Sequence, residues 1–423
     1  MIDINILRED PNAIRTATKA KNVDLDVDRL LELDKKVRAL KSEFEDIASQ
    51  KNAASKRIPS AGDDEKAKLL EEMRIVDRRG DDIKAELSPL EEELSEMLYR
   101  IPNPPAENVK IAASEEENEV LRTIGEKPDF RFTPKNHQEL GENLGIIDKE
   151  RAAQVSGARF TYIKGDGARL QLALIQLALS ETGKHGFVPV FVPNMIGARA
   201  MRAMGYLEHG GHDEIYYLNK DNMYLIGTSE QAIGPMHMDE TLDEEHLPLR
   251  YVGISPCYRR EAGSYGKDTK GILRMHQFDK VEMFSFVHPE KSDEEHELLL
   301  SIEESLMQQL GIPYQVIGIV SGDLGLPAAR KYDIEAWVPT QEAYRETHSC
   351  STTTDFQTRR LNTRFKNKEG KTEYVHALNG TVFAIGRILV AILENFQNED
   401  GSVTIPEVLR PYLGGQEKLE ATR

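Results

Sequence analysis

Apolar residues recur at alternating spacings of three and four along two stretches near the start of the chain. The first stripe runs from Leu30 to Ile47 and the second from Leu69 to Met97. In a helix this spacing places every member on one face. Two such stripes joined by a short turn can bury their seams against each other. The pattern therefore predicts an antiparallel helical coiled-coil arm over about residues 28–98.

A dimerisation coiled coil would show the same periodicity. The short turn Ser60–Asp64 favours pairing within one chain instead. Each helix should cover nearly 30 residues, which gives an arm of about 40 Å at 1.5 Å per residue. Pro89 lies inside the second stripe. It should kink or interrupt that helix locally, because proline lacks the N–H and clashes with the preceding turn.

The arm is flanked by different patterns on its two sides. Asp10-Pro11 resembles a helix cap followed by proline at the first helical position, which predicts a short helix towards Ala20. After the arm, the closely spaced prolines of Ile101–Glu107 cannot continue a helix and start a linker. We therefore expect an N-terminal domain over residues 1–104 and a linker over residues 105–120.

From about residue 120 the pattern changes to short β-rich runs with helices between them. Helices are predicted at Arg169–Glu181 and Glu294–Leu310. The predicted strands are Phe160–Ile163, Val188–Val192, Met223–Ile226, Tyr251–Tyr258, Met275–Phe284 and Tyr314–Ile319. Strands that come in neighbouring pairs and groups favour a mainly antiparallel sheet in an α+β domain over residues 121–423.

The composition indicates the cellular environment of the protein but says little about its chemistry. A hydrophobic content of 39% and a charged content of 30% fit a globular protein with a large solvated surface. No apolar run approaches the roughly 20 residues that span a bilayer, so no membrane association is expected. The cysteines Cys257 and Cys350 lack ligand-like spacing, which argues for a reducing compartment and hence the cytoplasm. The net charge of −18 neither supports nor excludes a nucleic-acid partner, because only the local field at a contact matters.

The segment Pro256–Phe284 carries the clearest candidate chemistry, and it reads as strand, glycine-containing loop and strand. Period-2 alternation groups charged and aromatic side chains on one face of each strand: Arg259 and Glu261 on the first, and Phe278, Lys280 and Glu282 on the second. Such a face is costly to bury unless a polar ligand satisfies it. A solvated charged hairpin is the alternative.

The loop between these strands contains three glycines that allow a tight turn, together with basic residues: Gly263, Gly266 and Gly271, with Lys267, Lys270 and Arg274. It is not a P-loop, because Asp268 follows Lys267 where Ser or Thr should stand.

Two further segments add weaker signals. Asn379-Gly380 should make a turn, and the helix after it is apolar nearly all round, so Arg387 needs an anionic partner there. That partner could be an internal carboxylate or a phosphate. In Gly186–Pro193, prolines within a strand suit the edge of a sheet, where subunits often pair.

In this order, the three segments resemble motifs 1, 2 and 3 of the class II aminoacyl-tRNA synthetases. Further motifs narrow the resemblance to the bacterial-type seryl-tRNA synthetase family: Gly227-Thr-Ser-Glu, Met275-His-Gln-Phe-Asp-Lys-Val-Glu, Tyr332-Asp-Ile-Glu-Ala-Trp, Tyr344-Arg-Glu-Thr-His-Ser-Cys-Ser, Asp355-Phe-Gln-Thr-Arg-Arg and Pro406-Glu-Val-Leu-Arg-Pro-Tyr. The resemblance covers essentially the whole chain, including the arm.

The resemblance implies an ATP site on motif 2. Arg259 would clamp the α-phosphate and Phe278 would stack under the adenine, with Arg387 over the other face or near the γ-phosphate. Glu346 and Ser349 are the implied Mg²⁺ positions, and Mg²⁺ prefers oxygen ligands. The complete implied ATP-binding set is Arg259, Arg260, Glu261, Met275, Phe278, Glu346, Thr347, His348, Ser349 and Arg387.

A serine pocket is implied beside it. Its residues would be Thr228, Ser229, Glu230, Arg259, Glu282 and Thr381, and the implied catalytic residues are Arg259, Glu282 and Arg387. Two positions depart from the family pattern. Thr381 stands where serine is common, and Thr347-His348 replaces the familiar surroundings of the Ser-Cys-Ser run. We interpret His348 as a space-filling neighbour.

The resemblance implies a serine–tRNA ligase that converts L-serine and ATP to seryl-adenylate and transfers the seryl group to the 3′ end of tRNA-Ser, and of tRNA-Sec. The arm would bind the tRNA, and Gly186–Pro193 would lie in a homodimer interface. Two other classes compete. A ligase that charges a carrier protein would lack the arm, and a paralogue with a dead site would not retain Arg259, Glu282 and Arg387.

Overall fold

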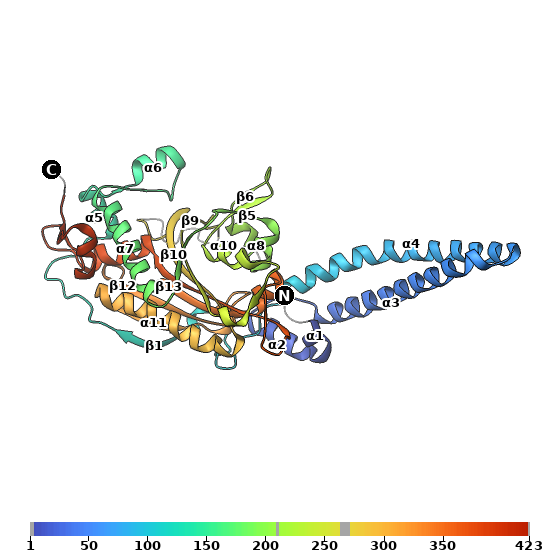
Figure 1. Ribbon diagram of the computed structural model, residues 1–423. Coiled ribbons are helices and arrows are strands. Elements are labelled where there is room, and N and C mark those ends of the chain that lie inside the picture. Colours follow the sequence, from blue (N-terminus) through green and yellow to red (C-terminus); the bar gives the residue numbers. More distant parts are fainter. Residues whose placement is uncertain (1–3, 209–210, 263–270, 422–423) are drawn as a thin grey trace. The chain divides into compact units, whose positions relative to one another are not determined.

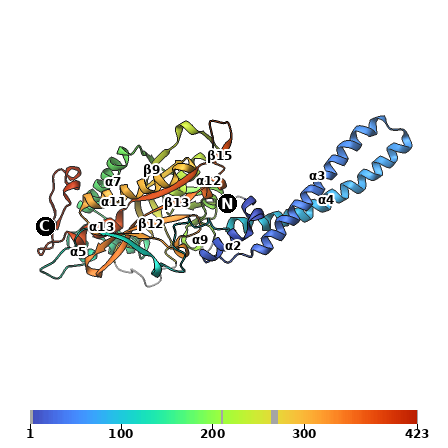
Figure 2. The ribbon, with the colours of Figure 1, turned by 90° about the horizontal axis from the view of Figure 1, so that it is seen from below.

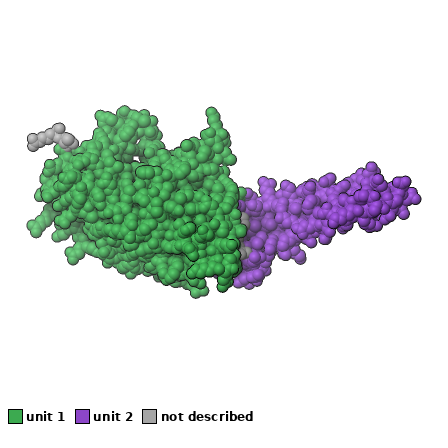
Figure 3. Space-filling view, viewed as in Figure 1, with its two compact units in different colours: residues 1, 20–22, 103–423 green, residues 2–19, 23–102 purple. Residues whose placement is uncertain are grey.

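The computed structural model describes residues 4–208, 211–262 and 271–421 (Figure 1). Its internal contacts divide the chain into two compact units (Figure 3). One contains residues 103–423 with residues 1 and 20–22, and the other contains residues 2–19 and 23–102. No helix of the described residues is both long and apolar enough to cross a membrane.

The smaller unit is built on the predicted hairpin (Figure 2). Helix α3 (Val27–Arg57) and helix α4 (Asp63–Arg100) pack along the two apolar stripes. The buried cluster consists of Leu40, Ile47 and Ile83, with Phe44, Val76, Leu87 and Leu90 packed against it. The helices have 31 and 38 residues, so at 1.5 Å per residue they are about 47 and 57 Å long, longer than predicted.

Of the predicted kink or interruption at Pro89, the interruption is wrong, because α4 continues through this residue. Leu87 and Leu90, on either side of the proline, pack against the same apolar cluster. This continuous packing compensates for the backbone hydrogen bond that proline removes. Two short helices precede the hairpin, α1 (Ile4–Glu9) and α2 (Pro11–Ala20). The predicted cap of α2 is confirmed, since Asp10 Oδ1 accepts from the backbone N–H groups of Asn12 and Ala13.

The larger unit contains an eight-stranded sheet with the order β1-β11-β12-β13-β16-β10-β9-β4. Its strands are β1 (Glu119–Ile124), β4 (Val188–Phe191), β9 (Leu249–Tyr258), β10 (Gln277–Val287), β11 (Tyr314–Gly318), β12 (Arg330–Val338), β13 (Ala343–Thr354) and β16 (His376–Ala384). β4 pairs in parallel with β9, whereas the other neighbours pair antiparallel. The predicted α+β class with a mainly antiparallel sheet is therefore confirmed.

Three helices cover this sheet (Figure 2). α7 (Asp166–Lys184), α11 (Ser292–Leu310) and α13 (Ile385–Asn395) bury their apolar residues in the main core. α11 packs against β13 and β16, and α13 packs against β10 and β12. Every residue of α13 apart from Arg387 is buried, as the apolar pattern predicted.

Shorter elements complete the unit. The helices are α5 (His137–Asn143), α6 (Lys149–Ser156), α8 (Ala198–Met204), α9 (Gly211–Glu214), α10 (Glu230–Ile233) and α12 (Phe356–Leu361). The strands are β2 (Ile147–Asp148), β3 (Tyr162–Ile163), β5 (Met195–Gly197), β6 (Tyr217–Leu218), β7 (Met223–Leu225), β8 (Thr241–Asp243), β14 (Arg364–Lys366), β15 (Thr372–Tyr374), β17 (Val403–Thr404) and β18 (Lys418–Leu419).

The prediction of a turn at Asn379-Gly380 is wrong, because both residues lie inside β16 between β10 and β13. Close packing favours glycine at position 380. A Cβ at this position would lie 3.1 Å from Glu303 Oε1 and 3.3 Å from Cys350 Cβ. The glycine therefore reflects the tight fit of α11 on the sheet, which a turn signal in the sequence cannot distinguish.

The segment before β1 packs on the sheet unit. The Asn103 side-chain amide donates to the carbonyl oxygens of Pro327 and Thr353, each at 2.8 Å. Val109 lies in a small apolar cluster with Ile317 and Ile319. Residues 103–118 are therefore tied to the sheet by hydrogen bonds and apolar contacts.

Candidate active site

Two adjoining hollows in the larger unit bring the predicted site residues together. Their walls share Arg259, Glu261, Arg274, Lys280, Glu346, Thr381 and Arg387. The first hollow also contains Met275, Phe278 and Thr347, and the second also contains Thr228, Glu230, Glu282 and Ser349. These residues come from β10, β13, β16, α10 and α13 and from the segments next to β9, β10 and α10, so the sheet register positions most of the site.

The alternation of side chains along β10 determines which of its residues form a wall of the hollows. Phe278, Lys280 and Glu282 alternate along this strand and line the hollows, as predicted. Glu282 is paired with Thr381 of β16, just after a register shift in β10. Thr381 Oγ1 donates to Glu282 Oε2 at 3.2 Å, and Lys280 forms an ion pair with the same carboxylate. Glu282 is thus held by a hydroxyl and an ammonium group.

Arg259 and Glu261 do not lie on β9, contrary to the prediction, because the strand ends at Tyr258. Glu261 adopts a φ of 52°, which turns the chain out of the extended conformation. Both residues still line the hollows. The Arg259 guanidinium carbon lies 5.3 Å from the centroid of the Phe278 ring, and Arg274 pairs with Glu261 at 3.1 Å.

Arg387 and Glu346 form an ion pair at the centre of this arrangement. Arg387 Nη1 lies 3.1 Å from Glu346 Oε1 and donates to the Glu346 carbonyl oxygen at 2.9 Å. Burial acts to raise the pKa of Glu346, but the positive charges of Arg387, Lys331 and Arg259 prevail and lower it to about 2. Of the two partners considered for Arg387, the structure supplies a carboxylate, Glu346, which is exposed and ionised at neutral pH.

Glu230 marks the other end of the site. Its carboxylate accepts from Tyr206 Oη at 2.7 Å and from Gln357 Nε2 at 2.9 Å. Burial raises its pKa, and the negative charge of Glu282 raises it further. Neither Tyr206 nor Gln357 was among the predicted site residues. Gln357 lies within the motif Asp355-Phe-Gln-Thr-Arg-Arg, which was a usable signal, whereas nothing in the sequence marks Tyr206.

Three predicted site residues are turned elsewhere. Ser229 is buried, and its Oγ forms a hydrogen bond with Ser255 Oγ at 2.8 Å. Arg260 is exposed, with its guanidinium carbon 5.5 Å from the centroid of the Tyr216 ring. His348 lies in the core, where its Nδ1 contacts Thr347 Oγ1 at 2.9 Å and burial lowers its pKa to about 3.

Strand alternation is the reason that His348 is turned away. Ser349, Ser351 and Thr353 of β13 face the second hollow, so the residues between them face the other side of the sheet. The His348 ring packs 5.9 Å from that of Phe383. This position fits the interpretation of His348 as a space-filling neighbour.

The two predicted Mg²⁺ positions, Glu346 and Ser349, lie in the same hollow. Asp333 of β12 is the register partner of Ser349, and its buried Oδ1 has no hydrogen-bond partner among the described residues. Burial raises the pKa of Asp333 to about 6. Within the described residues, no cluster of three or more His, Cys, Asp or Glu could hold a metal ion by itself. The oxygen groups therefore fit Mg²⁺ only if a ligand supplies further oxygens.

The predicted glycine-containing loop mostly lies outside the described residues, since residues 263–270 are not among them. Gly271 and Arg274, which follow, are described. Gly271 has a φ of 74°, a conformation that favours glycine.

Comparisons with known proteins agree with this geometry. Residues 215–396 match the tRNA synthetase class II core domain (G, H, P, S and T), and residues 1–105 match the seryl-tRNA synthetase N-terminal domain. Serine–tRNA ligase 1 of Streptomyces avermitilis is 47% identical over 426 residues, which is 99% of both chains.

Solved structures give the same result. The seryl-tRNA synthetase of Pyrococcus horikoshii, solved with ATP, is 38% identical with a TM-score of 0.92 and covers 100% of both chains. The cytoplasmic serine–tRNA ligase of Naegleria fowleri, solved with AMP, is 34% identical with a TM-score of 0.88, and the match covers 100% of this chain and 99% of that one.

The sheet, the site and the matched core domain together define a class II aminoacyl-tRNA synthetase. Both parts of the chain and its full-length relatives specify which one. The chain belongs to the seryl-tRNA synthetase family, and its activity class is that of a serine–tRNA ligase.

Proposed function

We propose that the two hollows bind ATP and L-serine side by side, and that seryl-adenylate forms between them. The observation that carries this assignment is the shared wall. Arg259, Glu346 and Arg387 line both hollows, and the second hollow adds the Glu230 and Glu282 carboxylates. The cationic part suits phosphates and the anionic part suits an ammonium group. The relative from Pyrococcus horikoshii was solved with ATP, which supports ATP as the substrate.

In this assignment Arg259 binds the α-phosphate, where negative charge develops as the serine carboxylate attacks. A fixed guanidinium stabilises that charge. Its contact with Phe278, and its hydrogen bond from Nε to the Gly227 carbonyl at 3.3 Å, hold it in place before ATP arrives. The nucleophile needs no general base, because a serine carboxylate is already ionised at neutral pH. Positioning and electrostatics therefore carry the rate.

Phe278 and Met275 would supply the apolar part of the nucleotide subsite, and Glu261, which lines the same hollow, would contact the adenine end. Arg387 would contact the nucleotide, either on the adenine face opposite Phe278 or near the γ-phosphate. Glu346 and Ser349 would hold Mg²⁺ together with phosphate oxygens, and the metal would neutralise charge on the leaving pyrophosphate. Arg260, Ser229 and His348 are assigned no direct contact, because their side chains are held elsewhere.

The serine subsite is assigned to the second hollow. Glu230 and Thr228 would bind the ammonium group, while Glu282 and Thr381 would meet the side-chain hydroxyl. The Thr381–Glu282 hydrogen bond offers donor and acceptor groups that a serine hydroxyl can join. Alanine leaves these groups unpaired and is rejected for that reason. The Thr381 methyl group narrows the space available to threonine.

The helical hairpin is assigned to the tRNA, since residues 1–105 match the N-terminal domain of the family. We assign tRNA-Ser, and by the same logic tRNA-Sec, as the substrates whose long variable arm it contacts. The domain limits are then 1–104 for tRNA binding, 105–120 for the linker and 121–423 for catalysis. This is a step of protein synthesis, for which the cytoplasm is the expected compartment.

We assign the interface of a homodimer to the edge of the sheet at β4. This edge strand carries exposed apolar side chains, with Val188 at 55% and Phe191 at 84% of full exposure. Leu172 of the neighbouring α7 is also exposed. An apolar edge strand is a ready surface for pairing with a second copy. Sedimentation of the purified chain tests this, because a monomer at micromolar concentration contradicts it.

Charging of tRNA tests the proposed function. Purified chain with ATP, Mg²⁺ and labelled serine should acylate a tRNA-Ser transcript, and Arg259→Ala should abolish the reaction while keeping the fold. A tRNA-Ser transcript without its variable arm should be charged poorly. Label transferred to a carrier protein instead of tRNA would support the competing ligase class and overturn the proposal.

A further inference from the structure

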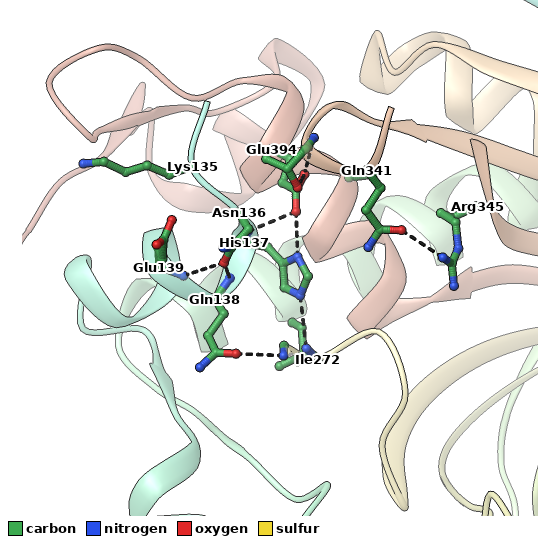
Figure 4. A network of polar contacts seen from close by, with 12 residues as sticks. Lys135, Asn136, His137, Gln138, Glu139, Ile272, Gln341, Arg345 and Glu394 are labelled. Carbon is green, nitrogen blue, oxygen red and sulfur yellow. Dashed lines mark hydrogen bonds and ion pairs between the residues drawn. The ribbon is translucent and has the colours of Figure 1, made fainter. Parts of the chain in front are cut away.

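Two adjacent side chains at the start of α5 hold the backbone of the Gly271–Met275 segment (Figure 4). The Ile272 N–H donates to His137 Nε2 at 3.3 Å, and the Gly271 N–H donates to Gln138 Oε1 at 2.9 Å. Successive backbone amides are thus bound by successive residues of one short helix. Ile272, Leu273, Arg274 and Met275 line the first hollow.

Gly271 shows that the contact with His137 is close. A Cβ at this position would lie 1.7 Å from His137 Nε2, so the imidazole sits directly against the backbone. The φ of 74° also disfavours any residue with a side chain. The chain conformation and the histidine therefore fit each other at a position where glycine is required.

Glu394 of α13 fixes the orientation and the tautomer of His137. Its Oε1 accepts from the His137 backbone N–H at 3.0 Å and from Nδ1 at 2.7 Å, and its Oε2 accepts from the Thr340 N–H and Oγ1. Burial acts to raise the pKa of Glu394, but these hydrogen bonds prevail and lower it. An ionised carboxylate only accepts, so Nδ1 is the donor to Glu394, and Nε2 is the acceptor of the Ile272 N–H.

The same helix that carries Glu394 carries Arg387, seven residues earlier. It also contacts the segment directly. A Cβ at Gly386 would lie 3.0 Å from Met275 Cε and 3.3 Å from the Ile272 carbonyl oxygen. α13 therefore positions the Gly271–Met275 segment at two points. Gly386 packs directly against it, and Glu394 acts through His137 on Ile272.

We propose that His137 is a positioning residue for the nucleotide subsite. It acts through the Ile272 backbone, which it holds in register with Arg387, and it touches neither substrate. The inference rests on the proposed function, in which the first hollow takes ATP. Loss of the Nε2 acceptor frees the Gly271–Met275 wall and weakens ATP binding, whereas the serine subsite, built on Glu230 and Glu282, is unaffected.

Two isosteric variants separate positioning from stability. His137→Asn keeps a donor near Nδ1 for Glu394 and removes the Nε2 acceptor. His137→Gln keeps an acceptor near Nε2 and removes the donor to Glu394. In serine-dependent ATP–pyrophosphate exchange, His137→Asn should raise KM for ATP roughly tenfold, as expected for one lost hydrogen bond, and leave KM for serine within about twofold. His137→Gln should keep KM for ATP near wild type and have the lower Tm.

The inference is overturned if KM for ATP rises in His137→Gln and not in His137→Asn, or if it changes in the same way in both variants. If both variants change KM for ATP equally, or if KM follows Tm, His137 has only a structural role. Gly271→Ala gives an independent check, because its methyl group collides with His137. Its effect on KM for ATP should shrink in a His137→Ala background, and strictly additive effects contradict the contact. Absence of exchange in the wild-type chain would instead contradict the proposed function, so the two failures are distinguishable.

Discussion

Arg387 Nη1 donates to the Glu346 carbonyl oxygen at 2.9 Å and lies 3.1 Å from Glu346 Oε1. The guanidinium on α13 is therefore oriented by both the backbone and the side chain of β13. Such a group needs little reorganisation when a phosphate approaches, which is the condition for strong electrostatic stabilisation.

Removal of this guanidinium should act mainly on the chemical step. We expect Arg387→Ala to lower kcat/KM for ATP by about 10²- to 10³-fold in pyrophosphate exchange, the usual effect of losing a preorganised charged donor. Glu346→Gln is the matched variant, since it removes the negative charge that orients Arg387 and is proposed to bind Mg²⁺. It should shift the Mg²⁺ dependence to higher concentration. Wild-type kinetics in Arg387→Ala would contradict the ATP assignment.

Serine binding should depend on pH through Glu230. Burial and Glu282 raise the pKa of this carboxyl, so it takes up a proton at a higher pH than an ordinary glutamate. Because the serine ammonium needs the ionised form, KM for serine should rise as pH falls, beginning above the usual glutamate range. Glu230→Gln should raise KM for serine about 10- to 100-fold and remove this dependence. KM for ATP serves as the internal control and should not change.

Selection of the serine hydroxyl should depend on Thr381. Thr381→Val keeps the shape and removes the hydroxyl that donates to Glu282 at 3.2 Å. We expect its serine-to-alanine ratio of kcat/KM to fall by about 10-fold or more. Thr381→Ser keeps the hydroxyl and should retain the serine activity while it accepts threonine better. An unchanged serine-to-alanine ratio in Thr381→Val would remove Thr381 from the specificity pocket.

The arm can be shortened without disturbing its base. Glu43 and Arg79 face each other across the hairpin, with bonds of 2.7 and 2.8 Å. Deletion of residues 44–78, with a short glycine-rich turn joining the two helices, should leave pyrophosphate exchange unchanged. Charging of tRNA-Ser should fall strongly, because the surface assigned to the tRNA is gone. If charging persists at the wild-type rate, the assignment of the arm is wrong.

The parts of the fold that depend on periodicity could be predicted from the sequence. The stripes Leu30–Ile47 and Leu69–Met97 fixed the hairpin, because the pattern of apolar residues directly determines which faces are buried. The interruption at Pro89 could not be judged in this way, because the outcome depends on packing against the other helix. Asn379-Gly380 shows the same limit, since its local turn signal is overridden by strand pairing on both sides.

Individual site residues could be predicted only where they belong to a recognisable sequence motif. Arg259, Glu282 and Arg387 meet in the hollows, but Ser229 and His348 are turned into the core by strand alternation and local packing. Tyr206, which donates to Glu230, comes from a segment without a motif. Contacts between distant segments of this kind depend on the tertiary structure and leave no local signal.

Amino-acid-dependent ATP–pyrophosphate exchange with the purified chain tests the central claim most directly. Serine should support exchange, while alanine and threonine should do so at least about 100-fold less efficiently, because the pocket rejects a missing hydroxyl and an added methyl group for different reasons. No exchange with serine, or equal exchange with alanine, would contradict the assignment of the two hollows as a serine-activating site.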